Sequence, residues 1–457
     1  MTATPHDYAK TNAGAFRSQL HDLLKIPSVS TLPQRAEDVR RTAEYIAADM
    51  RRIGLHNVEV MPTGGHPVVY GERLDAGSSA PTVLIYGHYD VQPAEKGDGW
   101  TDDPFTPVER DGKIFARGSS DDKGQMFIHV KAAESILSTE GKLPVNVKFI
   151  IEGEEEIGSP NLVPFLVANR EKLKADVCVI SDTGLLSPEQ PSIIYSLRGL
   201  TAMEIIVQGP NVDLHSGVFG GAVHNPVQAL AEIVAQLHKP DGSVAVPGFY
   251  DDVLALAEAE RAELRKTNWS DEEWQLMTGA PAWGEPGYTL RERVGARPTL
   301  EINGMAGGFY GDGIKTVLPA RALAKVTCRL VANQNPQKIF ELVRDYVQQI
   351  APPSVKVQVN QLRGSGSPAL VDIHTPAMQA AISAYEKGWG RAPVFMREGG
   401  SIPIVADFQR ELGTPVILMG FGLNTDGAHG PDEHFVIEMF HKGIDTAIHF
   451  LYEIAGQ

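Results

Sequence analysis

The sequence is poor in cysteine, since Cys178 and Cys328 are the only two among its 457 residues. Both stand in apolar, strand-like surroundings, so we expect buried free thiols and exclude the disulfide framework of a small secreted domain. Residues 1–7 lack the basic and apolar regions of a signal peptide. No uninterrupted apolar stretch is long enough to cross a bilayer, so we expect a cytoplasmic protein without a membrane partner.

Positive charge is also scarce, with 41 lysines and arginines against 57 aspartates and glutamates and a formal net charge of −16. A surface of this sign disfavours nucleic acids and anionic membranes as partners, although it does not identify a substrate. The length of 457 residues exceeds what one hydrophobic core usually serves. We therefore expect at least two domains.

The stretch from Thr82 to Asp90 joins a short apolar run to a histidine and a carboxylate. The run has the length of a buried strand, and ligands of open α/β sheets bind beyond the carboxyl ends of strands. His88 and Asp90 are two residues apart, so His88 could ligate a metal while Asp90 orients its ring. A hydrogen-bonded histidine without a metal explains this motif equally well.

Carboxylates end three later segments of the chain. Asp121 and Asp122 follow a Gly-Ser-rich turn, residues 152–156 follow an expected strand at 145–151, and Asp182 ends another apolar run. A helix cap explains a single Asp, and a solvated loop is the alternative for 152–156. Several carboxylates at a strand end are nevertheless unfavourable unless a cation neutralises them.

Together these residues form a mixed set of imidazoles and carboxylates, which suits zinc or a similar divalent ion. The set consists of His88, Asp90, Asp121, Glu155, Glu156, Asp182 and His429. It contains more ligands than one catalytic zinc needs. Two ions that share a carboxylate would use the set and leave one carboxylate free as a base.

Six motifs carry a resemblance to a known family: residues 88–90, 117–124, 152–159, 181–182, 213–217 and 429–433. In this order they resemble the di-zinc exopeptidase family of carnosinase-type dipeptidases, glutamate carboxypeptidase, aminoacylase, acetylornithine deacetylase and succinyl-diaminopimelate desuccinylase. The resemblance spans nearly the whole chain. Within the family, the sequence resembles the carnosinase-type branch most. The segments that carry this likeness are an insertion at 240–300 and residues 315–319, 328–333 and 397–403.

The resemblance implies two divalent ions per chain, zinc by preference, with manganese or cobalt as alternatives. Asp121 would bridge the ions, Asp90 would support a ligand histidine, and Glu155 would be the general base. The other implied ligands are His88 and Asp182 for one ion and Glu156 and His429 for the other. The Asp121–Asp122 peptide is expected to be cis, as in the family.

The resemblance also implies residues that act on a peptide substrate. His215 would reach across a homodimer and stabilise the oxyanion in the partner's active site. Arg329 would bind the terminal carboxylate of the substrate. Further implied contacts to the substrate are Thr316, Ser401 and His429.

At two positions a neighbouring residue of the same type could take the implied role. Glu154 precedes the expected Glu155–Glu156 pair, so the base could lie one residue away. His434 lies near His429, although the family pattern of a histidine, two residues and an acidic pair selects His429.

The predicted fold class is α/β. A zinc-exopeptidase-like catalytic domain with a mixed sheet flanked by helices covers residues 1–198 and 370–457, and an inserted α+β lid and dimerisation domain covers 199–369. The predicted function is hydrolysis of dipeptides or short peptides by a metal-bridging water that Glu155 activates. An N-acyl amino acid deacylase or desuccinylase of the same fold is the first alternative, because Arg329 suits its substrate too. A non-catalytic binding protein is the second, although every ligand and the base are present.

Overall fold

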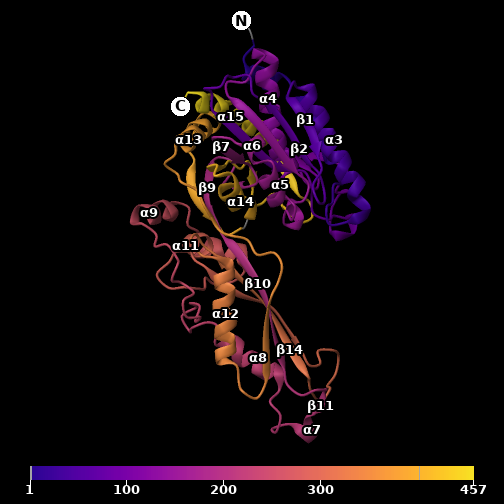
Figure 1. Ribbon diagram of the computed structural model, residues 1–457, viewed down its shortest axis with the longest axis vertical. Helices are drawn as coiled ribbons and strands as arrows, with labels where there is room; N and C mark the ends of the chain where they lie inside the picture. Colours follow the sequence, from indigo (N-terminus) through magenta and orange to yellow (C-terminus); the bar gives the residue numbers. More distant parts are fainter. Residues whose placement is uncertain (1–2, 401, 457) are drawn as a thin grey trace. The chain divides into compact units, whose positions relative to one another are not determined.

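The computed structural model describes residues 3–400 and 402–456. The chain forms two units (Figure 1). The first unit contains Met1–Tyr195, Val371–Phe395 and Ile404–Gln457, and the second contains Ser196–Leu370 and Met396–Pro403. The first unit is therefore assembled from both ends of the chain, and the second is inserted into it.

A nine-stranded mixed sheet has most of its strands in the first unit. Its order is β1 (His56–Met61), β2 (Val68–Arg73), β6 (Asn146–Glu152), β3 (Thr82–His88), β7 (Val177–Ile180), β18 (Val416–Leu418), β9 (Ser192–Leu197) and β16 (Ala369–Leu370), with β17 (Val394–Glu398) also paired to β9. The central strands β6, β3, β7 and β18 are parallel, whereas the pairs on either side are antiparallel. The predicted mixed sheet is thus confirmed.

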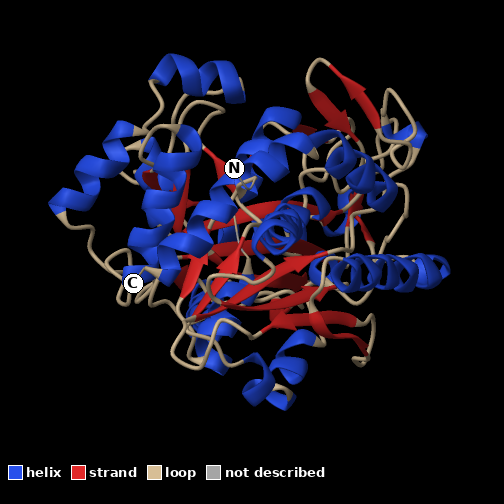
Figure 2. Ribbon diagram, turned by 90° about the horizontal axis from the view of Figure 1, so that it is seen from above, coloured by secondary structure: helices blue, strands red, loops and turns tan. Residues whose placement is uncertain are grey.

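Helices cover both faces of this sheet because alternate residues of the buried strands point to opposite layers (Figure 2). On β3, Val83 and Ile85 join a core with helices α1 (Pro5–Thr11), α2 (Ala13–Leu24), α3 (Ala36–Arg52), α4 (Lys123–Glu140), α13 (Pro376–Trp389) and α15 (Ile437–Ala455). Tyr86 points the other way and packs edge-on against Phe408 of α14 (Pro403–Leu412), with ring centroids 5.3 Å apart. The helices α5 (Leu162–Ala168) and α6 (Arg170–Leu173) follow β6.

Two small sheets complete the first unit, and both lie near chemically important loops. One contains β20 (His434–Val436), β5 (Lys113–Phe115) and β4 (Val108–Arg110), and the other pairs β19 (Gly422–Leu423) with β8 (Gly184–Leu185). The first of them brings residues around 434 beside residues around 115.

The second unit is a four-stranded antiparallel sheet in the order β12 (Thr299–Gly307), β14 (Arg321–Leu330), β10 (Gly199–Gln208) and β15 (Lys356–Gln361). Helices α8 (Pro226–Ala235) and α12 (Pro336–Ile350) pack on one face over residues such as Val326 and Cys328. The alternate residues, including Arg329, point to the other face. The remaining elements are β11 (Leu214–His215), β13 (Val317–Leu318), α7 (Ser216–Phe219), α9 (Glu258–Lys266), α10 (Asp271–Thr278) and α11 (Leu290–Ala296).

Both cysteines are buried free thiols, as expected from their apolar surroundings. Within the described residues, no helix carries an apolar stretch of the length that a bilayer requires.

Candidate metal centre

The carboxyl ends of three adjacent parallel strands, β6, β3 and β7, meet at one edge of the large sheet. His88 is the last residue of β3, and Asp182 follows the end of β7. Fully buried His88 directs its Nε2 to Asp121 Oδ1 at 3.1 Å, with Asp182 Oδ2 4.0 Å away. The parallel order of the strands thus brings together residues that lie far apart in the sequence.

Asp121 belongs to two groups of potential ligands, and within each group the ligand atoms lie within 4.8 Å of one another. The first group is His88, Asp121 and Asp182, and the second is Asp121, Glu156 and His429. While Oδ1 of Asp121 faces the first group, Oδ2 lies 3.0 Å from His429 Nε2. His429 Nε2 in turn lies 3.2 Å from Glu156 Oε2. Asp121 therefore offers one oxygen to each group, which is the arrangement of a bridging carboxylate.

Asp90 connects the histidine to the acidic turn. Its carboxylate oxygens accept hydrogen bonds from the main-chain N–H groups of Glu155 and Glu156, both at 3.1 Å. Nδ1 of His88 lies 3.1 Å from the main-chain oxygen of Asp90 and 3.4 Å from its carboxylate. Such contacts fix the orientation of a ligating imidazole.

The electrostatics of the site favour a cation. Burial, assisted by neighbouring carboxylates, raises the pKa of Glu155 to about 7 and that of Asp182 well above its usual value. Burial also acts to raise the pKa of Asp121, but hydrogen bonds from His429 and His88 outweigh it and lower the value. A divalent ion would relieve this concentration of buried negative charge, so the residues present fit bound metal.

The two alternative residues, Glu154 and His434, make contacts elsewhere. The Glu154 carboxylate accepts hydrogen bonds from the His66 main-chain N–H and the Asn161 side chain, both at 2.9 Å. His434 lies 2.9 Å from the main-chain oxygen of Asp432 and 3.0 Å from Lys113 Nζ. Among the described residues, neither one belongs to the two groups around Asp121.

Glu433 organises the loop that presents Asp121, a role that sequence reasoning missed. Its fully buried carboxylate accepts hydrogen bonds from Arg117 Nη1 at 2.7 Å and from the N–H groups of Gly118, Ser120 and Asp121 at 3.0, 2.9 and 3.1 Å. Both Arg117 and Glu433 stand inside recognised motifs, but 316 positions separate them. The Asp121–Asp122 peptide bond in this loop is cis, as expected.

The second unit carries His215, the residue expected to stabilise the oxyanion. His215 is exposed on β11, beside Thr316, whose main-chain oxygen accepts a hydrogen bond from Ser216 at 3.0 Å. His215 Nδ1 accepts a hydrogen bond from the Gly217 N–H at 2.9 Å. In the neutral imidazole the hydrogen therefore resides on Nε2, which makes His215 a hydrogen-bond donor.

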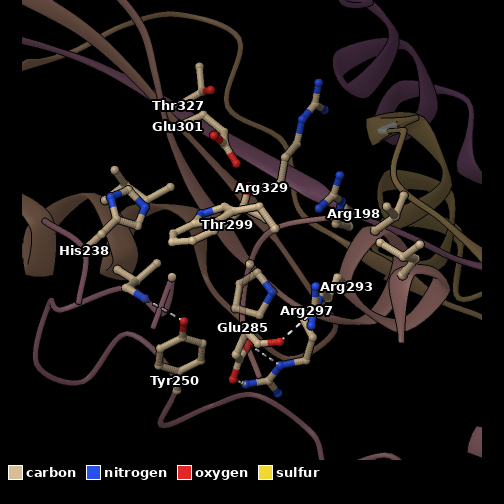
Figure 3. A pocket seen from close by; sticks show the side chains of 18 of the residues that line it. Arg198, His238, Tyr250, Glu285, Arg293, Arg297, Thr299, Glu301, Thr327 and Arg329 are labelled. Atoms are coloured by element: carbon tan, nitrogen blue, oxygen red, sulfur yellow. Dashed lines mark hydrogen bonds and ion pairs between the residues drawn. The ribbon is translucent and has the colours of Figure 1, made fainter. Parts of the chain in front are cut away.

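Arg329 lines a cavity of about 460 Å³ within the second unit, together with Arg198 (Figure 3). Burial, followed by the positive charge of Arg329, lowers the pKa of Arg198 to about 10. Arg198 also donates from its main-chain N–H to Gly400 O and from Nε to Gly399 O, both at 3.1 Å. Ser401, the next residue of that loop, lies outside the described residues.

His215 and Arg329 lie toward opposite ends of the second unit's sheet. Asp213 contacts the main chain of Ala320, just before β14 begins at Arg321, whereas Arg329 stands near the other end of β14 (Figure 1). Eight strand residues span about 27 Å, far more than the ~7 Å of an extended dipeptide. One dipeptide cannot therefore contact both side chains of the same chain in this conformation.

Two groups of potential metal ligands at one edge of an α/β sheet are typical of metal-dependent hydrolases. The chain belongs to the peptidase family M20/M25/M40, whose family model matches residues 84–453. This match confirms the family predicted from the motifs.

Individual relatives are similar over nearly their full lengths. The Cys-Gly metallodipeptidase dug1 of Schizosaccharomyces pombe is 34% identical, over 96% of this chain and 96% of that protein. The human Beta-Ala-His dipeptidase is 31% identical, over 94% of this chain and 87% of that protein. The crystal structure of the M20 metallo-carboxypeptidase Sso-CP2 from Sulfolobus solfataricus superimposes with a TM-score of 0.84, at 33% identity over 97% and 99% of the two chains. These relatives confirm the predicted enzyme class, a metal-dependent dipeptidase.

Proposed function

We propose that this chain hydrolyses dipeptides at a centre of two divalent ions, zinc by preference, bridged by Asp121. His88 and Asp182 would complete one coordination site, and Glu156 and His429 the other. The observation that carries the proposal is the division of the Asp121 carboxylate, with one oxygen toward His88 and the other toward His429.

Bound ions would lower the pKa of a water molecule and polarise the peptide carbonyl. Glu155 would accept the proton of the attacking water and deliver it to the departing amine. Burial raises the pKa of Glu155 to about 7, and bound cations would lower it again, which keeps the carboxylate ionised and able to accept a proton at neutral pH. Glu155 is a member of neither ligand group among the described residues, which leaves its carboxylate available for this role.

Substrate selection would depend on the cavity that holds Arg329 and Arg198. Two guanidinium groups in one partly enclosed cavity attract a carboxylate, and a dipeptide presents one at its carboxyl end. Thr316, Ser401 and His429 would contribute further contacts. Cys-Gly and β-Ala-His, the dipeptides in the names of the relatives, are the first substrates to examine.

A homodimer would account for the distance between His215 and Arg329, because the partner subunit's His215 could then contact the substrate that Arg329 binds. Exposed apolar side chains gather near the His215 end of the sheet: Val212, Val218, Phe219, Met305, Tyr310 and Ile314. The edge strand β12 also ends there, opposite Ala322. Such a surface supports dimerisation. The first unit would be the catalytic domain and the second the lid and dimerisation domain, while a cytoplasmic location stays a prediction.

A substrate panel tests the proposed function against deacylation. With Zn²⁺, Mn²⁺ or Co²⁺ supplied separately, we expect dipeptides such as Cys-Gly and β-Ala-His to be cleaved faster than N-acetyl or N-succinyl amino acids. The measurement is kcat/KM for each pair of matched substrates. An acyl amino acid that exceeds every dipeptide with all three ions would replace the dipeptidase assignment with the deacylase.

Substitution of the two adjacent glutamates tests the division of roles. Glu155→Gln should lower kcat about a hundredfold or more, the usual scale for a lost general base, and leave the metal content near that of the wild type. Glu156→Gln should instead lower metal occupancy, which elemental analysis measures. Each variant serves as the control for the other, and exchanged phenotypes would move the base by one residue.

A further inference from the structure

A third group of potential ligands lies outside the centre around Asp121. It consists of His6 on α1 and Asp445 and His449 on α15, and its ligand atoms also lie within 4.8 Å of one another. This group joins the first helix of the chain to the last one. Both ends of the chain lie in the same unit (Figure 1).

The three side chains face one another across the contact between α1 and α15. Asp445 and His449 are four residues apart on α15, so they share one face of that helix. Oδ1 of Asp445 contacts His6 Nδ1 directly, and Oδ2 lies 3.8 Å from His449 Nε2. The two imidazole rings lie with their centroids 4.2 Å apart.

Two imidazole nitrogens and one carboxylate oxygen are a ligand set that zinc and similar transition ions prefer. In a tetrahedral site with bonds of about 2.0–2.2 Å the ligand atoms lie ~3.4 Å apart, so small side-chain rotations would close this group. All three side chains are partly exposed, at 33%, 38% and 24% for His6, Asp445 and His449. An ion can therefore enter, and a water molecule can supply the fourth ligand.

We infer that His6, Asp445 and His449 bind a divalent transition ion that fastens α1 to α15, separately from the catalytic centre. Helix α1 is short, and its docking depends on buried Pro5 and on partly buried Tyr8 and Ala9. Terminal segments of this kind open locally unless they are fixed in place. An ion that requires ligands from both helices binds only the docked state, so it opposes the opening of α1.

The test uses the full chain without a histidine tag, with Zn²⁺ as the probe. We expect the wild type to bind one more Zn²⁺ per chain than His449→Gln or His6→Gln. At free Zn²⁺ ten times the Kd of this site, amide exchange in α1 should slow about tenfold in the wild type and not in either variant.

His441→Gln is the matched control. His441 precedes Asp445 by one turn of α15 and lines the same surface groove, but its Nε2 faces Arg17 Nη1 at 3.4 Å. This variant should retain the extra ion and the slowed exchange. Equal Zn²⁺ content in the wild type, His6→Gln and His449→Gln would contradict the proposed site. Amide exchange in α1 that Zn²⁺ still slows in both ligand variants would contradict it too. Because two variants on different helices are compared, misfolding of one does not decide the result.

Discussion

Removal of divalent ions should abolish peptide hydrolysis by this chain. The partly buried site contains Asp121, Glu155, Glu156 and Asp182 with only two histidines among the proposed ligands, so its own residues lack the electrophile that a peptide carbonyl needs. After exhaustive chelation and dialysis we expect less than about one hundredth of the original rate, on the scale of losing Lewis-acid catalysis.

Readdition of Zn²⁺, Mn²⁺ or Co²⁺ should restore the rate, and elemental analysis should find two catalytic ions per chain. The analysis is cleanest in the His449→Gln background, in which the third group of ligands is disabled and the catalytic groups are intact. Full activity in a stripped sample whose metal content is near zero would contradict the two-ion centre.

His215→Ala should lower kcat by roughly two to three powers of ten while KM changes little. The reason is the hydrogen on Nε2, since Nδ1 already accepts the Gly217 N–H. A donor of this kind acts on charge that develops only in the transition state, so its loss affects turnover more than binding.

His224→Ala is the matched control for that substitution. His224 lies in the same unit, but its Nδ1 contacts the Ser354 hydroxyl and its Nε2 lies 3.4 Å from Glu232. It should retain nearly wild-type kcat. If His215→Ala instead raised KM by roughly two to three powers of ten and left kcat unchanged, His215 would act in substrate binding rather than on the oxyanion.

The candidate site was predictable where it depends on strand ends. His88, the acids after β6 and Asp182 follow apolar runs, and parallel strands place such ends at one edge of a sheet. Asp121 and His429 come from loops, and their approach depends on long-range contacts such as those of Glu433. No local pattern encodes that pairing. The sequence placed both residues among the possible ligands, but only the family resemblance assigned Asp121 as the bridge and His429 to the second ion.

The fold shows the same division between local and long-range information. Local pattern suffices for elements such as α12, where Ile339, Val343 and Val347 recur at helical spacing on the buried face, and β14, where buried residues alternate with more exposed ones. The order of the outer strands was not predictable, because β1, β2 and β9 are placed by packing between distant segments. The sequence marked residues 240–300 only as an insertion, and the structure shows that they contain α9, α10 and α11 and line the cavity of Arg329.

Subunit mixing tests most directly the claim that two chains complete each active site. His215→Ala and Glu155→Gln should each be nearly inactive as homodimers. In a mixed dimer, the His215→Ala chain keeps its Glu155 and receives His215 from the other chain, which makes one whole site. Random reassociation makes about half of the dimers mixed, so mixing should recover up to about a quarter of the wild-type activity. No recovery from verified mixed dimers would contradict the account, because His215 would then act within its own chain or outside catalysis.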